Sequence, residues 1–276
     1  MPCKEALPKP PGRSWLRHIL VFSGLVVLAL LTKFILHLLL PRNVSATGEM
    51  LSLQLPGGPF QVPCFCGPQR PKGIIILGTG DGGWSYWEEN TAKHLADTGY
   101  AVGGWDCRKF ADSRKYDQAQ LCAGFLAAVG AVRQRTGAED SAPVWYGGWS
   151  TGAEQSVAAA ACADRPPQLV GLLLAAPSTR GRYGITTGDL LGGTPTGPDS
   201  FALADMAAQL KGLRVVQFAA GLDPLDDEEW IKHLPPPYHL IRLPGKLHDM
   251  GNAGPEFQSK VDEAIAWTLQ PAPPTP

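Results

Sequence analysis

The residues with the clearest chemical meaning lie at Gly148–Gly152, where the sequence is Gly-Trp-Ser-Thr-Gly around Ser150. The apolar run Ala142–Gly147 precedes them, and an alanine-rich run with helical spacing follows. This order predicts a strand, a sharp turn with a serine at its apex, and a helix. A G-x-S-x-G turn of this kind, here called the elbow, presents a nucleophilic serine above a parallel sheet. We therefore predict that Ser150 is a nucleophile; the alternative is a serine in an ordinary glycine turn.

A serine hydroxyl needs a base to take its proton, so the elbow predicts a histidine and an acid later in the chain. In folds built this way the acid follows one late strand and the histidine follows the next. Asp223 comes just after the apolar run that ends at Ala220, and His248 comes just after the run that ends at Leu243. We predict Asp223 as the acid and His248 as the base. The acidic run Asp226–Glu229 offers alternative acids, although such residues also favour the dipole of a helix they open.

A tetrahedral intermediate also needs hydrogen-bond donors for its oxyanion. The segment Gly78–Trp84, here called the glycine loop, follows an early buried strand, where such folds supply one backbone donor. We predict the Asp81 and Thr151 amides as the donor pair. The alternative, a phosphate-binding loop, lacks the lysine of the P-loop pattern.

Side chains around these positions are expected to contact the substrate. The predicted substrate-binding residues are Gly80, Gly82, Trp84, Trp149 and Glu154. Asp81, Glu154 or the run Asp226–Glu229 could attract a cationic group on the substrate. For the acidic run, the alternative is a solvated helix surface.

The segments Ile76–Trp84, Gly148–Glu154 and Ala176–Thr179 together resemble bacterial virulence proteins of the VirJ/AcvB type. The resemblance covers most of residues 70 to 252, and the Gly-Asp-Gly-Gly-Trp element is its most specific part. Thr151 and Glu154 stand where the family usually has Phe and Asp. The resemblance implies a periplasmic α/β-hydrolase with Ser150, Asp223 and His248 as nucleophile, acid and base. It also implies similarity to enzymes that remove the aminoacyl group from aminoacyl-phosphatidylglycerol.

Strand-like and helix-like runs alternate along the chain from about residue 70 onwards. This alternation predicts a mostly parallel sheet with helices on both faces, and so an α/β-hydrolase-like fold. The polar, glycine-rich stretch 178–200 predicts a small lid. The expected organisation is as follows: 1–17, a cytoplasmic tail; 18–40, a transmembrane signal-anchor; 41–70, a membrane-proximal segment with the first strands; 71–270, the catalytic domain; 271–276, a disordered proline-rich tail.

The N-terminus carries an apolar run, Ile19–Leu40, that is about long enough to cross a bilayer. Four basic residues precede it and only Arg42 directly follows, so the positive-inside rule places the N-terminus in the cytoplasm. We predict a single-pass protein of the bacterial inner membrane with its catalytic domain in the periplasm. The alternative is a cleaved signal peptide with Val44–Ala46 at the processing site.

Composition limits the ligands. The formal charge of −1, without a basic cluster past residue 42, argues against nucleic acid. We expect no metal and no cofactor. Five of the six cysteines would be exported, namely Cys64, Cys66, Cys107, Cys122 and Cys162. This odd number leaves at least one thiol free or paired with another chain. Cys107 with Cys122 is one pairing that the spacing allows.

Together these features predict a periplasm-facing serine esterase that acts on a membrane lipid, with the bilayer contacted through the N-terminal segment. One alternative is a non-catalytic periplasmic factor that binds secretion-system proteins. Another is a general carboxylesterase or lipase, which shares the chemistry but would need a wide apolar cap.

Overall fold

The computed structural model describes residues 18, 21–29, 31–32 and 43–270. The chain divides into two compact units, Met1–Arg42 and Asn43–Pro276, and the second is here called the main unit. Within the described residues, no helix has the length and apolar character needed to cross a membrane. Residues 19–20, 30 and 33–40 of the predicted anchor at 18–40 lie outside these residues, as do the tails at 1–17 and 271–276.

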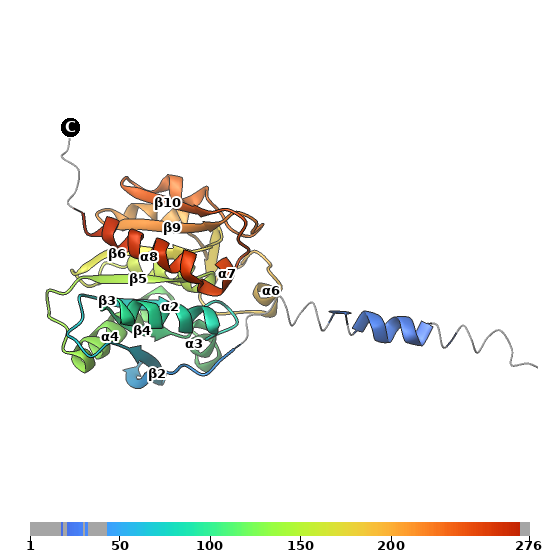
Figure 1. Cartoon of the computed structure of the whole chain (residues 1–276), viewed down its shortest axis with the longest axis horizontal. Helices are drawn as coiled ribbons and strands as arrows, with labels where there is room; N and C mark the ends of the chain where they lie inside the picture. The colour runs from blue at the N-terminus through green and yellow to red at the C-terminus, as the bar shows by residue number, and fades with distance from the viewer. Residues whose placement is uncertain (1–17, 19–20, 30, 33–42, 271–276) are drawn as a thin grey trace, which may run out of the picture. The chain divides into compact units, whose positions relative to one another are not determined.

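The main unit is built on an eight-stranded sheet in the order β1-β2-β4-β3-β5-β6-β9-β10. Only the pairs β1–β2 and β2–β4 are antiparallel; every other neighbouring pair is parallel. The strands are β1 (Glu49–Leu55), β2 (Gly58–Phe65), β3 (Ile74–Gly78), β4 (Ala101–Trp105), β5 (Val144–Trp149), β6 (Leu169–Ala175), β9 (Arg214–Ala220) and β10 (Tyr238–Leu243). Segment 41–70 therefore contributes two strands to the same sheet (Figure 1).

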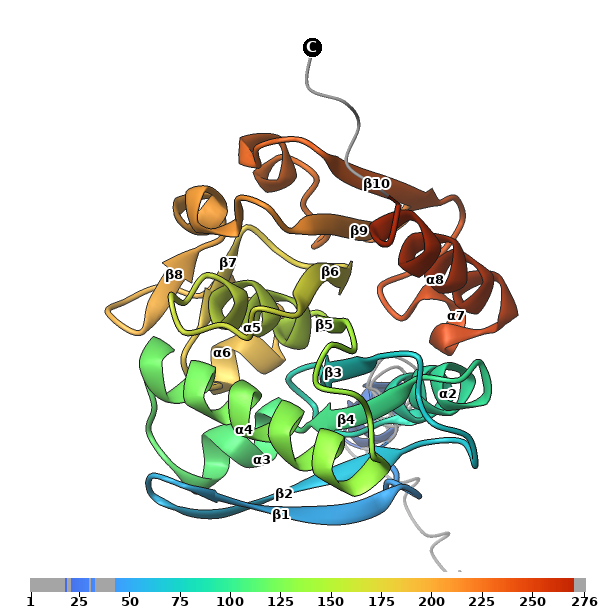
Figure 2. The same cartoon turned by 90° about the vertical axis from the view of Figure 1, so that its left-hand side faces the viewer.

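Helices cover both faces of this sheet. The helices are α2 (Tyr86–Asp97), α3 (Cys107–Ser113), α4 (Gln118–Thr136), α5 (Thr151–Ala160), α6 (Thr187–Leu190), α7 (Met250–Ala253) and α8 (Pro255–Thr268), with 3-10 turns η1 (Ala204–Leu210) and η2 (Trp230–His233). Figure 2 shows α4 and α5 on one side of the sheet and α2 and α8 on the other. The central strands are apolar throughout because each of their faces meets a helical layer.

Alternate residues of each central strand enter two separate cores. Ile74 and Ile76 of β3 pack into the core under α4 and α5, whereas Ile75 and Leu77 pack into the core under α2 and α8. Successive side chains of a strand point to opposite faces, so a four-residue apolar run serves both cores. The predicted α/β architecture is confirmed, and the buried carboxyl ends of the strands are held at one edge of the sheet.

Two regions of the main unit depart from a simple alternation of strands and helices. Strand β2 pairs with both β1 and β4, although three prolines lie in or beside it. Between β6 and β9 the chain forms a short strand, β8 (Ser200–Ala202), followed by η1. β8 pairs with β7 (Arg180–Arg182), and this two-stranded ribbon with α6 forms the excursion between β6 and β9 that was expected to be a small lid.

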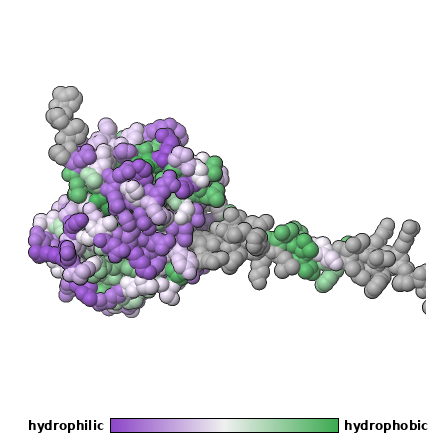
Figure 3. Space-filling view, in the orientation of Figure 1, coloured by the Kyte–Doolittle hydropathy of each residue, from purple (hydrophilic) through white to green (hydrophobic). Residues whose placement is uncertain are grey.

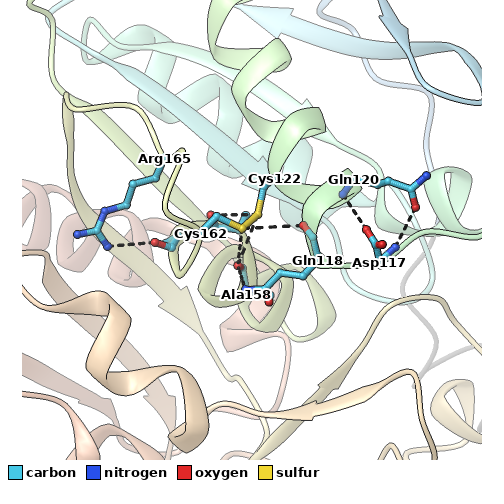
Figure 4. The surroundings of a disulfide bond; sticks show 9 residues. Asp117, Gln118, Gln120, Cys122, Ala158, Cys162 and Arg165 are labelled. Atoms are coloured by element: carbon cyan, nitrogen blue, oxygen red, sulfur yellow. Dashed lines mark hydrogen bonds between the residues drawn. A yellow bond between two sulfur atoms is a disulfide. The ribbon is translucent and has the colours of Figure 1, made fainter.

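The cysteines of the main unit pair differently from the sequence-based suggestion. Cys122 of α4 is bonded to Cys162 at the end of α5 (Figure 4), while Cys64, Cys66 and Cys107 are free. Cys107 is instead a free thiol, fully buried at the start of α3. The disulfide ties the helix that follows Ser150 to α4.

Candidate active site

Ser150 lies between β5 and α5 with the backbone geometry expected at an elbow. Its φ of 53° and ψ of −122° fall in a region that non-glycine residues rarely occupy. Such strain persists only where surrounding packing enforces it. Here β3 and α5 enforce it, because a Cβ on Gly152 would lie 2.2 Å from the carbonyl oxygen of Gly78. The glycines on both sides of the serine thus let the start of α5 contact β3 directly.

Asp223 and His248 meet beyond the carboxyl ends of β9 and β10. His248 Nδ1 lies 2.6 Å from Asp223 Oδ2, and the Asp223 side chain is 1% exposed. Burial lowers the pKa of His248, but the hydrogen bond and charge of Asp223, helped by Asp226 and Asp81, outweigh it and raise the pKa above its usual value. Burial raises the pKa of Asp223, but the hydrogen bond and charge of His248 bring it below its usual value. The pair is therefore arranged to stabilise a charged imidazole.

Trp149 connects the elbow to the histidine. Its indole Nε1 donates to the carbonyl oxygen of His248 at 2.8 Å, and the two rings lie 5.2 Å apart. On its other side the indole packs against Gly80, where a Cβ would lie 3.1 Å from the ring. Trp149 therefore connects the elbow to the glycine loop and to the loop that contains His248.

One buried carboxylate that the sequence analysis missed holds the glycine loop, at Gly80 within the loop and at Ser85 directly after it. Glu88, fully buried in the first turn of α2, accepts from the Gly80 amide at 3.2 Å and from the Ser85 amide at 2.9 Å. The Ser85 hydroxyl donates to the same carboxylate at 2.6 Å. Burial raises the pKa of Glu88 to about 7, although the three donors favour its ionised form. The Ser-x-x-Glu capping box at 85–88 was the available sequence signal.

The two predicted oxyanion donors lie where their amides remain available. Among the described residues, neither the Asp81 amide nor the Thr151 amide donates a hydrogen bond to another protein group. Thr151 is the first residue of α5, so its amide belongs to the unpaired N-terminal turn of that helix. β3 and β5 pair in register at Gly78 and Gly148, which brings the glycine loop and the elbow side by side.

Three of the predicted substrate-binding side chains are buried, those of Trp84, Trp149 and Glu154. Trp84 stacks on Phe65, with ring centroids 5.7 Å apart, and its indole donates to Glu89. Glu154 is 5% exposed and accepts from the Ser178 amide and hydroxyl at 3.1 and 2.6 Å. Burial raises the pKa of Glu154 to about 7. The side chains of Trp84 and Glu154 thus contact groups of the protein interior, and their role in substrate binding stays a prediction. Gly80 and Gly82 remain in the glycine loop, and Gly82 is partly exposed.

The carboxylates of the acidic run Asp226–Glu229 form hydrogen bonds and ion pairs with other residues of the main unit. Asp226 accepts from the Ala220 amide at 2.7 Å and from a neighbouring glutamine, and burial raises its pKa to about 7. Asp227 accepts from the Trp230 amide, and the other two members of the run form ion pairs with Arg242 and Lys232. These contacts fix the loop after β9. Asp223, not one of its neighbours, is the acid in contact with His248.

The residues after His248 form a turn whose backbone is in the left-handed conformation. Met250, Gly251, Asn252 and Ala253 all have positive φ, between 48° and 70°. Met250 and Ala253 are buried, and the Asn90 side chain donates to the Asn252 carbonyl at 3.1 Å. Because left-handed residues other than glycine cost free energy, packing against α2 must hold this turn. The turn fixes the path of the chain directly after the histidine.

Comparisons with known proteins support the fold. No family model matches the chain, and no curated protein matches it. Solved structures do: an α/β hydrolase from a Penicillium species has a TM-score of 0.59 at 13% identity and covers 80% of this chain and 97% of its own. A lidless α/β serine hydrolase from Xanthomonas campestris gives 0.54 at 19% identity, covering 84% and 100%. A dienelactone hydrolase from Anabaena variabilis gives 0.53 at 16% identity, covering 80% and 95%. The main unit therefore has the α/β-hydrolase fold.

Proposed function

We propose that this protein is a serine hydrolase that cleaves an ester. The observation that carries the proposal is the contact between Asp223 and His248 beside the strained elbow of Ser150. In this mechanism Ser150 Oγ attacks the ester carbonyl and His248 Nε2 takes its proton. Asp223, on the other ring nitrogen, orients the imidazole and stabilises its charged form.

The backbone supplies the second part of the chemistry. The Asp81 and Thr151 amides donate to the oxyanion of the tetrahedral intermediate, while the N-terminus of α5 adds a favourable dipole. His248 then returns the proton to the leaving alcohol, and water repeats the sequence to release the acyl group. The ester bond breaks and an acid and an alcohol form, without any oxidant or reductant.

We further propose that the ester is the aminoacyl ester of aminoacyl-phosphatidylglycerol. The sequence resemblance to VirJ/AcvB-type proteins supports this substrate, as does the apolar run 19–40, which would hold the main unit at the periplasmic face of the inner membrane. Asp81 adds a chemical argument. Burial raises the pKa of its carboxyl above the usual value, although the charges of His248 and Arg108 oppose this shift. A carboxylate beside the oxyanion site is unfavourable unless a cation accompanies the substrate, and an aminoacyl group carries one.

A general carboxylesterase is the second candidate. It is favoured by the likeness in fold to a lidless serine hydrolase and to a dienelactone hydrolase. The Asp81 carboxylate separates the two candidates. A carboxylesterase for neutral esters gains nothing from this charge, whereas an aminoacyl esterase does.

Full-length protein in detergent should be incubated with aminoacyl-phosphatidylglycerol and, separately, with a neutral short-chain ester. We expect both activities to disappear in Ser150→Ala, together with labelling by a fluorophosphonate probe. Asp81→Asn keeps the backbone amide but removes the charge, so it should slow aminoacyl-ester cleavage about ten-fold more than neutral-ester cleavage. Undiminished cleavage in Ser150→Ala would refute the mechanism. Equal effects of Asp81→Asn on both esters would favour the carboxylesterase.

A further inference from the structure

Exposed apolar side chains lie in the two loops that carry Asp223 and His248, directly after α6 and at the start of α2. We call them the mouth residues: Tyr86, Leu191, Leu222, Leu225 and Leu247. Their exposed fractions range from 46% for Tyr86 to 79% for Leu191. Large apolar side chains that cluster on a surface commonly mark a site for a ligand, a protein or a membrane.

Hydrogen bonds and contacts join the loops that hold these residues. Leu222 directly precedes Asp223, and its amide donates to the Lys246 carbonyl at 2.9 Å, one residue from Leu247. The Leu225 amide donates to Asp223 Oδ1 at 3.0 Å. The lid reaches the same place, because a Cβ on Gly192 would lie 3.5 Å from Leu225 Cδ1. Leu191 and the three later leucines therefore occupy one edge of the main unit.

The other exposed large apolar residues of the main unit are dispersed. Met50 lies on β1, Leu126 on the outer face of α4, and Tyr238 at the start of β10. Leu269 follows α8. The last residue of this helix, Thr268, accepts a hydrogen bond from the indole of Trp145 near the start of β5. Leu269 therefore lies toward the opposite edge of the sheet. Figure 3 shows a face of the main unit that is mostly hydrophilic, with hydrophobic residues in smaller groups.

The main unit also begins beside the mouth residues. Asn43 forms a β-bridge with Ser85, and the Val44 amide donates to the Trp84 carbonyl at 3.1 Å. Ser85 directly precedes Tyr86. The apolar run ends at Leu40, so three residue steps, about 10 Å of extended chain, separate it from Asn43. A bilayer that holds residues 19–40 would thus hold the glycine loop close to its surface.

We propose that the mouth residues form a docking surface for the lipid bilayer, into whose headgroup region their side chains insert. The inference rests on the membrane placement within the proposed function, and it deepens that proposal. Apolar side chains at this depth lose water-exposed area and hold the active site against the leaflet that contains the substrate. An aminoacyl-lipid can then reach Ser150 without leaving the membrane completely.

The test places a fluorescent probe at one exposed leucine on each edge of the main unit. Full-length Leu222→Cys and Leu269→Cys are each made in a Cys3→Ser, Cys66→Ser, Ser150→Ala background and labelled with an environment-sensitive dye. The labelled proteins are reconstituted in vesicles of phosphatidylcholine and phosphatidylglycerol that contain a lipid with a shallow nitroxide quencher. Since Ser150→Ala removes catalysis, the readout does not depend on the proposed hydrolase activity.

We expect lipid-borne nitroxide to quench the probe at 222 roughly three-fold more strongly than the probe at 269, with a blue-shifted emission. Leu191→Cys, on the lid, should behave like the probe at 222. Equal quenching at the two edges would overturn the proposal. Energy transfer between probes at 222, with a dimer in sedimentation, would overturn it as well, because a second copy of the chain would then cover the mouth.

Discussion

The close contact between β3 and α5 makes Gly152→Ala a sensitive probe of the elbow. The added Cβ would lie 2.2 Å from both C and O of Gly78 and 2.7 Å from the Thr79 carbonyl oxygen. All three atoms are backbone, so the helix must move away by roughly 1 Å to reach ordinary contact distance. Overpacking of this kind costs about 1–3 kcal/mol, and the better helix propensity of alanine returns at most about 1 kcal/mol. We expect a net loss of about 2 kcal/mol in the free energy of unfolding.

Gly130 provides a matched control in α4. It is exposed, and a Cβ there would meet nothing within 4 Å. Gly130→Ala should therefore stabilise the protein by about 0.5–1 kcal/mol through helix propensity alone. Urea unfolding of both variants in the same detergent gives the comparison, with an unchanged m-value as the criterion of a shared unfolding transition.

Gly152→Ala should also impair chemistry, because a shift of α5 by this amount moves the Thr151 amide away from the oxyanion. We expect turnover to fall by about 10²-fold. The reasoning is refuted if Gly152→Ala unfolds at the same urea concentration as the unchanged protein while Gly130→Ala is stabilised. In that case the packing of β3 against α5 would not be what strains Ser150.

Four further expectations concern the site and the disulfide that ties α5 to α4. Asp223→Asn should lower turnover about 10³–10⁴-fold, because the imidazole loses the acceptor that orients it. Activity should rise with pH through a midpoint above 6.5, since the base must be neutral and Asp223 raises the pKa of His248; an unmoved midpoint in Asp223→Asn would contradict this assignment. Glu88→Gln keeps the size of the side chain but weakens its hydrogen bonds to the glycine loop and Ser85. Steady-state kinetics should show turnover reduced about ten-fold with little change in KM. Equal changes in both constants would instead indicate a role in binding. Reduction of the Cys122–Cys162 disulfide, which closes a separation of 40 residues, should lower the free energy of unfolding by about 4 kcal/mol in urea titrations. No change on reduction would show that the packing of α4 against α5 makes the bond redundant.

Local sequence signals located much of the proposed catalytic machinery. The elbow is recognisable because strand, turn and helix each leave a mark within about twenty residues of one another. Asp223 and His248 could be chosen because parallel strands bring their carboxyl ends to one edge. The strand before His248 ends at Leu243, where the sequence run ends.

The supporting residues could not be identified in the same way. Glu88 looks like an ordinary capping residue, and only the fold shows that it also holds Gly80, eight residues earlier in the chain. Trp84 and Glu154 stand within motifs that suggest substrate contact, yet both are buried. Whether a side chain faces a substrate or the core depends on which distant segment packs against it.

The sequence by itself determined the order of the elements, the serine turn and the positions of the late acid and histidine, because hydrophobic period and turn chemistry are local properties. The tertiary structure alone decided which cysteines pair, which carboxylates are bonded to other residues of the chain, and which edge of the main unit carries the exposed leucines. These outcomes depend on contacts between residues far apart in the chain. Such contacts arise from the joint packing of all the elements, which no single stretch of sequence encodes.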